Sequence, residues 1–210
     1  MSRTILKAAG VLLATISWTS AGAASEADLA SIRQQLDPAP VVRGQFEQDK
    51  TLAGFDLPLR SSGRFCFSRD HGVIWQIEQP FAATVVISAE HLRERDGDGP
   101  WRQTDSASQP AIAMIHRLSQ ALMGADLGQL REHFVLRTQT EADHWQLQLS
   151  PLNGPMAEFL HQAQVRGQAT VQQLTLIEAS GDRTEIRLQG EPAPSLSPIE
   201  ARLLQSRRGD

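Results

Sequence analysis

The side chains that could do chemistry in this sequence are scattered along it rather than grouped. The single cysteine, Cys66, lies in an apolar segment, which favours a buried thiol over a nucleophile and leaves no second cysteine for an internal disulfide. No Gly-x-Ser-x-Gly elbow and no phosphate-binding glycine loop occurs. The six histidines form none of the close pairs that a zinc site uses; they are His71, His91, His116, His133, His144 and His161. We therefore expect no metal site, no cofactor and no enzymatic activity.

One acidic segment has the start of a calcium-binding loop but not its end. Asp96 and Asp98 alternate with glycines as in such a loop, yet the twelfth position is Ala107, where a bidentate glutamate is required. The same Asp-Gly-Asp-Gly run followed by Pro100 is typical of a tight turn between strands. The turn is the better interpretation.

The amino terminus predicts export. Two basic residues, Arg3 and Lys7, precede an apolar run from Ala8 to Trp18, and small residues follow as far as Ala23. This order is that of a cleavable signal peptide over residues 1–23, and the run is shorter than the roughly 20 apolar residues that span a bilayer. No cysteine follows the cleavage site, so we expect no lipid anchor. The predicted location of the mature chain is the periplasm.

The rest of the chain has the charge and length of one soluble domain. Loss of Arg3 and Lys7 lowers the formal net charge from -4 by two, to -6. An acidic chain without a clustered basic surface is a poor partner for nucleic acid. Residues 24–210 are numerous enough to bury a sizeable core, and no repeat or hinge divides them. We expect a single domain and a monomer.

Alternation of apolar and polar residues predicts a meandering antiparallel sheet. The predicted strands cover residues 46–52, 63–67, 73–77, 84–87, 91–95, 101–104, 145–149, 174–178 and 186–188. Alternation also predicts which side chains face inward, where they either line a hydrophobic cavity or fill a solid core. These inward candidates are Phe65, Phe67, Trp75, Ile77, Val85, Ile87, Trp145, Leu147 and Leu149.

Helical spacing of apolar residues interrupts this alternation near the start and in the middle of the chain. A first helix begins after Ser25, a plausible N-cap, and stops at the prolines from Pro38 onward; shorter helices are predicted over 127–134 and 199–204. A long helix follows Pro110, and it either covers the concave face of the sheet or packs as an ordinary core helix. Its apolar stripe, with two methionines that suit a surface able to repack, is Ile112, Met114, Ile115, Leu118, Leu122 and Met123. The fold class is α+β.

A series of short motifs follows in order through the first half of the mature chain. They are Phe46-Glu47-Gln48, Gly63-Arg64-Phe65-Cys66-Phe67-Ser68-Arg69, Ile74-Trp75, Gln79-Pro80 and Val85-Val86-Ile87. This order resembles that of the LolA family of periplasmic lipoprotein carriers. From Pro110 to Gly190 only the order of elements agrees.

The resemblance implies an unclosed, half antiparallel β-barrel with a helical lid over a cavity for acyl chains. It also implies that Arg69 hydrogen-bonds to the lid and latches the empty carrier, a role that suits the five donors of a guanidinium. The alternative is a surface arginine at a strand end. Asp70 stands where the family has proline, and the tail lacks a C-terminal strand motif. These departures suggest a divergent paralogue with a cargo other than standard lipoproteins.

The function that follows as an expectation is transport of an acylated lipoprotein or lipid from the inner toward the outer membrane. The expected partners are that cargo, an inner-membrane transporter that loads it and an outer-membrane acceptor that unloads it. The alternative is a structural or sensor envelope domain with no transported cargo. A hydrolase would need a nucleophile or an acid–base cluster, and the sequence shows none.

Overall fold

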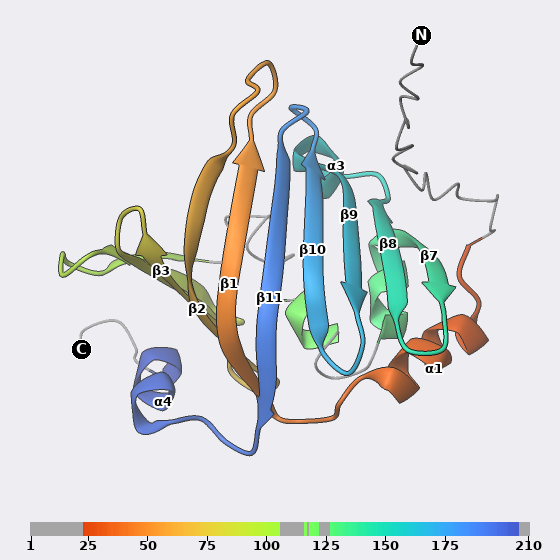
Figure 1. Cartoon of the computed structure of the whole chain (residues 1–210), viewed down its shortest axis with the longest axis horizontal. Coiled ribbons are helices and arrows are strands. Elements are labelled where there is room, and N and C mark those ends of the chain that lie inside the picture. The colour runs from red at the N-terminus through yellow and green to blue at the C-terminus, as the bar shows by residue number, and fades with distance from the viewer. Residues whose placement is uncertain (1–22, 106–115, 117, 122–126, 206–210) are drawn as a thin grey trace, which may run out of the picture.

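A computed structural model describes residues 23–105, 116, 118–121 and 127–205. Eleven strands form one antiparallel sheet in the order β6-β5-β4-β3-β2-β1-β11-β10-β9-β8-β7. Within the described strands β6 and β7 remain as the two edges, so the sheet is an unclosed half-barrel, as expected (Figure 1).

The sheet consists of two arms joined at its centre. The first arm contains β1 (Val41–Thr51), β2 (Leu59–Ser68), β3 (Gly72–Gln79), β4 (Ala83–Ile87), β5 (His91–Asp96) and β6 (Arg102–Asp105). The second contains β7 (Phe134–Thr140), β8 (Trp145–Pro151), β9 (Leu160–Gly167), β10 (Val171–Glu178) and β11 (Arg183–Ala193). Each arm is a meander of neighbouring strands, and the arms meet where β1 pairs with β11 over the full length of both strands.

Glycines permit the close approach of strands around this junction. A Cβ atom on Gly44 of β1 would lie 1.9 Å from the carbonyl oxygen of Gln189 in β11. A Cβ atom on Gly63 of β2 would lie 1.9 Å from the carbonyl oxygen of Gln76 in β3. Only glycine leaves room for such backbone contacts, which accompany tight curvature of a sheet.

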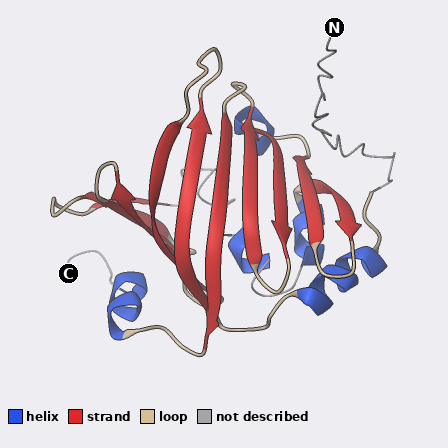
Figure 2. Cartoon of the chain, viewed as in Figure 1, coloured by secondary structure: helices blue, strands red, loops and turns tan. Residues whose placement is uncertain are grey.

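Helical segments, blue in Figure 2, pack around the sheet. They are α1 (Glu26–Gln35), the 3-10 helix η2 (Leu127–Glu132), α3 (Pro155–Phe159) and α4 (Pro198–Gln205), and His116 and residues 118–121 are also helical. The predicted N-cap Ser25 is confirmed: its hydroxyl accepts from the amide of Asp28, whose carboxylate accepts from the amide of Ser25. Among the described helices, none is long and apolar enough to cross a bilayer.

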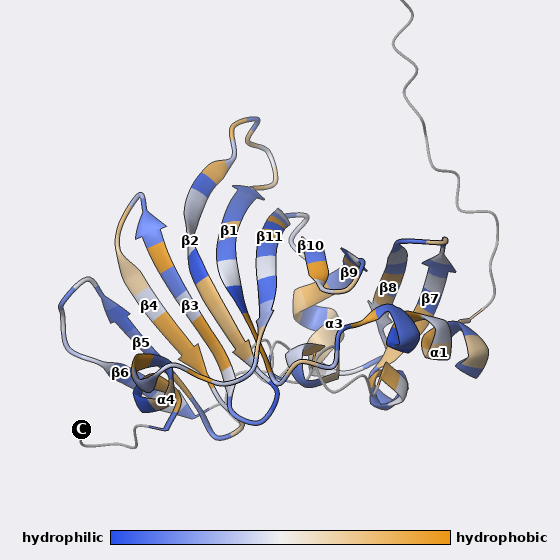
Figure 3. Ribbon diagram, turned by 60° about the horizontal axis from the view of Figure 1, so that its bottom comes forward, coloured by the Kyte–Doolittle hydropathy of each residue, from blue (hydrophilic) through white to orange (hydrophobic). Residues whose placement is uncertain are grey.

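The helices cover both faces of the sheet. Leu29 and Ile32 of α1 are fully buried against η2 and the inner side chains of β7 to β9. On the opposite face, Leu204 of α4 packs with Cys66, Ile74 and other residues of β1 to β4. The hydrophobic parts of β3 and β4 lie toward α4 in Figure 3. Successive side chains of β2 point to opposite faces of the sheet. Cys66 therefore packs on the face that α4 covers, whereas Phe65 and Phe67 point to the other face.

Candidate functional site: an apolar pocket in the half-barrel

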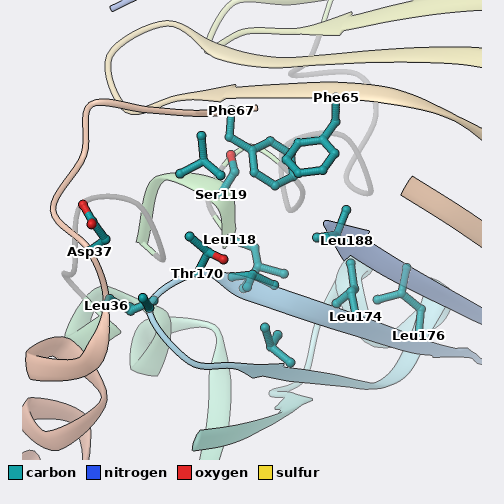
Figure 4. Close-up of a pocket in the computed structure, with 14 residues that line it drawn as sticks. Leu36, Asp37, Phe65, Phe67, Leu118, Ser119, Thr170, Leu174, Leu176 and Leu188 are labelled. Carbon is teal, nitrogen blue, oxygen red and sulfur yellow. The ribbon is translucent and has the colours of Figure 1, made fainter. Parts of the chain in front are cut away.

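An apolar pocket lies between the concave face of the sheet and the helical residues around Leu118 (Figure 4). Both arms of the sheet contribute to it, as do the linker between α1 and β1 and the turn between β9 and β10. The lining residues are Leu36, Asp37, Val42, Phe65, Phe67, Leu118, Ser119, Val165, Ala169, Thr170, Val171, Leu174, Leu176 and Leu188.

The aromatic wall of the pocket is built across three strands. Phe65 of β2 is opposite Gly44 of β1, which is opposite Gly190 of β11. A Cβ atom on Gly190 would lie 2.9 Å from the Cζ atom of the Phe65 ring, so the glycine makes room for this ring. The ring centroids of Phe65 and Phe67 are 4.8 Å apart, and both rings reach the pocket. The two phenylalanines therefore form a continuous apolar surface.

The few polar side chains of the pocket are Asp37, Ser119 and Thr170. The amide of Asp37 donates to the carbonyl oxygen of Ala169 at 2.8 Å, which ties the α1–β1 linker to the β9–β10 turn. The hydroxyl of Ser119 donates to the carbonyl oxygen of His116 at 2.8 Å. The Asp37 amide and the Ser119 hydroxyl thus bond to neighbouring backbone carbonyl groups. The other lining side chains, apart from Thr170, are apolar.

The volume of the pocket is small. It is about 90 Å³, whereas sites for drug-sized ligands occupy roughly 300–1,000 Å³.

The inward candidates predicted from alternation occupy four different places. Phe65 and Phe67 line the pocket. Trp75 and Ile77 belong to an adjoining cluster, in which the rings of Trp75 and Phe46 stack with centroids 3.8 Å apart. Val85 and Ile87 pack on the other side of Phe67.

The fourth group fills a solid core, which is one of the two alternatives that alternation left open for the inward residues. Trp145, Leu147 and Leu149 of β8 are buried in a filled core under α1 and η2, and none of them lines the apolar pocket. The physical reason is that α1 and η2 cover this arm of the sheet. The indole nitrogen of Trp145 donates to the carbonyl oxygen of Gln168, which fixes the ring in that core.

Of the predicted lid residues, Leu118 lies in the described part of the chain, is buried and lines the pocket. The others lie outside the described residues: Ile112, Met114, Ile115, Leu122 and Met123. Their role as a lid stays a prediction.

Arg69, at the end of β2, contacts the linker that forms one side of the pocket. Its guanidinium donates to the carbonyl oxygens of Pro38 and, at 3.3 Å, Ala39, and its backbone amide donates to that of Pro40 at 2.9 Å. The latch on the lid stays a prediction, while the bonds of Arg69 to the linker are a feature that sequence reasoning did not identify. Asp70 is exposed.

Several lining residues were also not identified from the sequence. Leu174, Leu176 and Leu188 showed the alternation of a hairpin, which was a usable signal for their inward position. Leu36 continues the helical spacing of Leu29 and Ile32, but its place at the pocket depends on tertiary contacts, as does that of Ala169 in the β9–β10 turn. No local pattern marks Ala169.

The reactive side chains outside the pocket have ordinary structural surroundings. Burial, reinforced by the charge of Glu200, raises the pKa of the Cys66 thiol to about 12, so the thiol is protonated at neutral pH. The run from Asp96 to Gly99 forms the β5–β6 turn, with Gly97 at φ +50°. Among the described residues no group of three or more His, Cys, Asp or Glu side chains is placed to hold a metal.

Residues 21–197 match the family model for outer membrane lipoprotein carrier protein LolA-like sequences. Among solved structures, a LolA superfamily protein from Nitrosomonas europaea aligns with a TM-score of 0.47 and 8% identity, over 83% of this chain and 95% of that chain. A DUF1329 family protein from Desulfovibrio piger aligns with a TM-score of 0.46 and 13% identity, over 85% and 97%. MucB aligns with a TM-score of 0.37 and 12% identity, over 86% and 62%. A search of curated proteins finds no match.

Proposed function

We propose, since this chain belongs to the family of LolA-like outer membrane lipoprotein carrier proteins, that it binds the acyl chains of a lipoprotein or lipid and carries them across the periplasm. The signal peptide supports export, and the cargo moves from an inner-membrane transporter toward an outer-membrane acceptor. No step of this function requires catalysis.

The observation that carries the proposal is the apolar pocket that both arms of the half-barrel enclose. Phe65, Phe67 and Leu118 form three of its walls, and its polar groups are few. A hydrocarbon chain gains about 0.8 kcal/mol for each methylene that leaves water. A pocket of this composition therefore suits an acyl chain better than a polar metabolite.

The pocket is small for an acyl chain, at about 90 Å³, so loading enlarges it. Loading separates the α1–β1 linker and the helical residues near Leu118 from the sheet. Arg69 opposes this movement, because its hydrogen bonds hold the linker against the end of β2. Cargo displaces these contacts when it binds, and release then requires an acceptor that binds the cargo more favourably.

The test is native mass spectrometry of the mature protein purified gently from the periplasm, followed by solvent extraction of bound lipid. The blocking variant is Ala169→Trp, because an indole at this exposed turn position would occupy the pocket without placing a charge in the core. The matched control is Val135→Trp on β7, which is 39% exposed and does not line the pocket. We expect bound lipid on the wild type and on the control, and a loss of at least about tenfold on Ala169→Trp.

An empty wild-type protein that also binds no hydrophobic dye would overturn the carrier and favour the structural or sensor domain. Equal lipid on both tryptophan variants would show that the lipid sits elsewhere. Circular dichroism and thermal unfolding of both variants establish that the sheet is intact.

A further inference from the structure

The face of the second arm opposite the apolar pocket carries a row of polar side chains. In β8, Trp145 and Leu147 point into the core, so Gln146 between them points to the other face. Gln146 is directly opposite Gln139 of β7 on one side and Arg166 of β9 on the other. Directly opposed residues of antiparallel strands share a face. The row therefore crosses three strands.

A polar groove runs over this row. Its volume is about 300 Å³, at the lower end of the roughly 300–1,000 Å³ typical of ligand sites. Two hairpin turns, β7–β8 and β9–β10, lie at the same end of the sheet and border the groove (Figure 1). A register shift between Val171 and Gln173 places the extra residue Gln172 at its edge.

Two hydrogen-bond donors in the groove have no acceptor. The side chain of Gln146 is 7% exposed, and its Nε2 atom is buried without a hydrogen-bond partner among the described residues. The Nε atom of Arg166 is likewise buried without a partner, and no carboxylate in the described part of the chain forms an ion pair with this guanidinium. Buried donors without acceptors and unpaired charges are both costly, and a ligand that supplies acceptors would satisfy both groups.

The neighbouring side chains do not supply acceptors for Gln146 Nε2 and Arg166 Nε. Gln173, opposite Arg166, donates its amide to Glu185 at 2.7 Å, and Gln172 donates to Gln168 at 3.1 Å. Glu141, the one carboxylate that lines the groove, lies 3.2 Å from His144.

We propose that this groove is a binding site for an oxyanion, a phosphate or carboxylate group, held by the fork of Arg166 and the side-chain amide of Gln146. A guanidinium fork matches two oxygens of such a group, and hydrogen bonds to a charged acceptor are stronger than those to a neutral one. The anion is either a free ion or the head group of a lipid. The site lies across the sheet from the apolar pocket and does not depend on acyl-chain binding there.

The experiment is a titration of the ¹⁵N-labelled mature protein, observing the Nε–H of Arg166 and the side-chain amide of Gln146 by NMR. The probes are inorganic phosphate, sodium acetate and dihexanoyl phosphatidylglycerol below its micelle concentration, with sodium chloride at equal ionic strength as the reference. We expect saturable shifts of both signals with at least one oxyanion and none with chloride. Tighter binding of the phosphatidylglycerol than of phosphate would identify a lipid head group, and the reverse a free ion.

The variant that tests the assignment is Arg166→Gln in β9, and its matched control is Arg137→Gln on the same face of β7, which is separated from β9 by β8 and lies outside the groove at this residue. We expect the dissociation constant to rise about tenfold or more for Arg166→Gln and less than twofold for the control. An equal rise of the dissociation constant in both variants would show that the anion is attracted by positive charge in general and is not held by Arg166. Absence of saturable shifts in the wild type overturns the proposal without recourse to any variant.

Discussion

At the scale of single residues, Arg69 links the sheet to the segment that must move. Its hydrogen bonds reach the carbonyl oxygens of the α1–β1 linker, and Leu36 and Asp37 of this linker line the pocket. The family resemblance implies a contact of Arg69 with the lid, which stays a prediction, whereas its hydrogen bonds to the linker are present in the structure. Removal of the Arg69 side chain would therefore loosen the linker and, with it, the side of the pocket that the linker forms.

We predict that Arg69→Ala accelerates uptake of a fluorescent fatty acid, because the linker loses hydrogen bonds worth about 1 kcal/mol each. The expected change is roughly fivefold in the association rate measured by stopped-flow fluorescence. Arg64→Ala is the matched control, since Arg64 lies on the same strand, is 66% exposed and pairs with Glu78 at the surface. Identical rates for both variants would argue against a restraining role of Arg69.

At the scale of elements, α4 is fixed to the outer face of the sheet by an ion pair as well as by its apolar side. The guanidinium of Arg43 donates to both carboxylate oxygens of Glu200 at 3.0 and 2.9 Å and to the carbonyl oxygen of Ser195 at 2.6 Å. Burial alone would raise the pKa of Glu200, but the hydrogen bonds from Ser197 and the charge of Arg43 outweigh it and lower this pKa below its ordinary value of 4.5. The carboxylate is therefore more stable in the folded protein than in the unfolded chain.

A carboxyl group with a lowered pKa stabilises the folded state above its unfolded pKa, and this contribution is lost as the pH falls through the folded value. We predict that Arg43→Met costs about 1–3 kcal/mol at pH 7 and distinctly less once the pH is below the lowered pKa of Glu200, where this carboxyl is protonated in both proteins. Urea unfolding of wild type and variant at both pH values measures the difference. A cost that does not change with pH would show that packing rather than charge makes this contact.

The elements that could be predicted from the sequence are those with a strong periodic signal. In the first arm β-branched and aromatic residues alternate between turns, and all six strands were predicted. In the second arm β9 was not predicted, because Ala163 and Gly167 give its buried face little hydrophobic contrast. β7 was also missed: it follows η2 after a single residue, His133, without a glycine or proline to mark the change. Four of the fourteen lining residues come from the α1–β1 linker and the β9–β10 turn, and the meeting of these two segments is a property of tertiary structure without a local signature.

At the scale of the whole molecule, the junction of the two arms decides whether the half-barrel forms. We predict that Gly44→Ala destabilises the protein by more than about 3 kcal/mol, because its Cβ atom would lie 1.9 Å from a backbone oxygen of β11. Gly54→Ala is the control: it has φ +84° but no neighbour within 4 Å, so it bears only the dihedral cost of about 1 kcal/mol. Thermal and urea unfolding of both variants distinguish crowding at the junction from backbone strain. A similar loss for both would mean that the strands separate easily.

The pairing of β1 with β11 also sets the order of events while the protein folds. Val41 pairs with Ala193, so the first and last strands of the chain close the largest loop in the molecule. Each arm can assemble early from local hairpins, but the two arms join only after the last strand has been made, and such long-range closure is slow. During that interval β1 and β10 each present an unpaired edge, which is the kind of surface on which chains aggregate. The interval before the two arms join is thus the period in which this protein is most prone to aggregate.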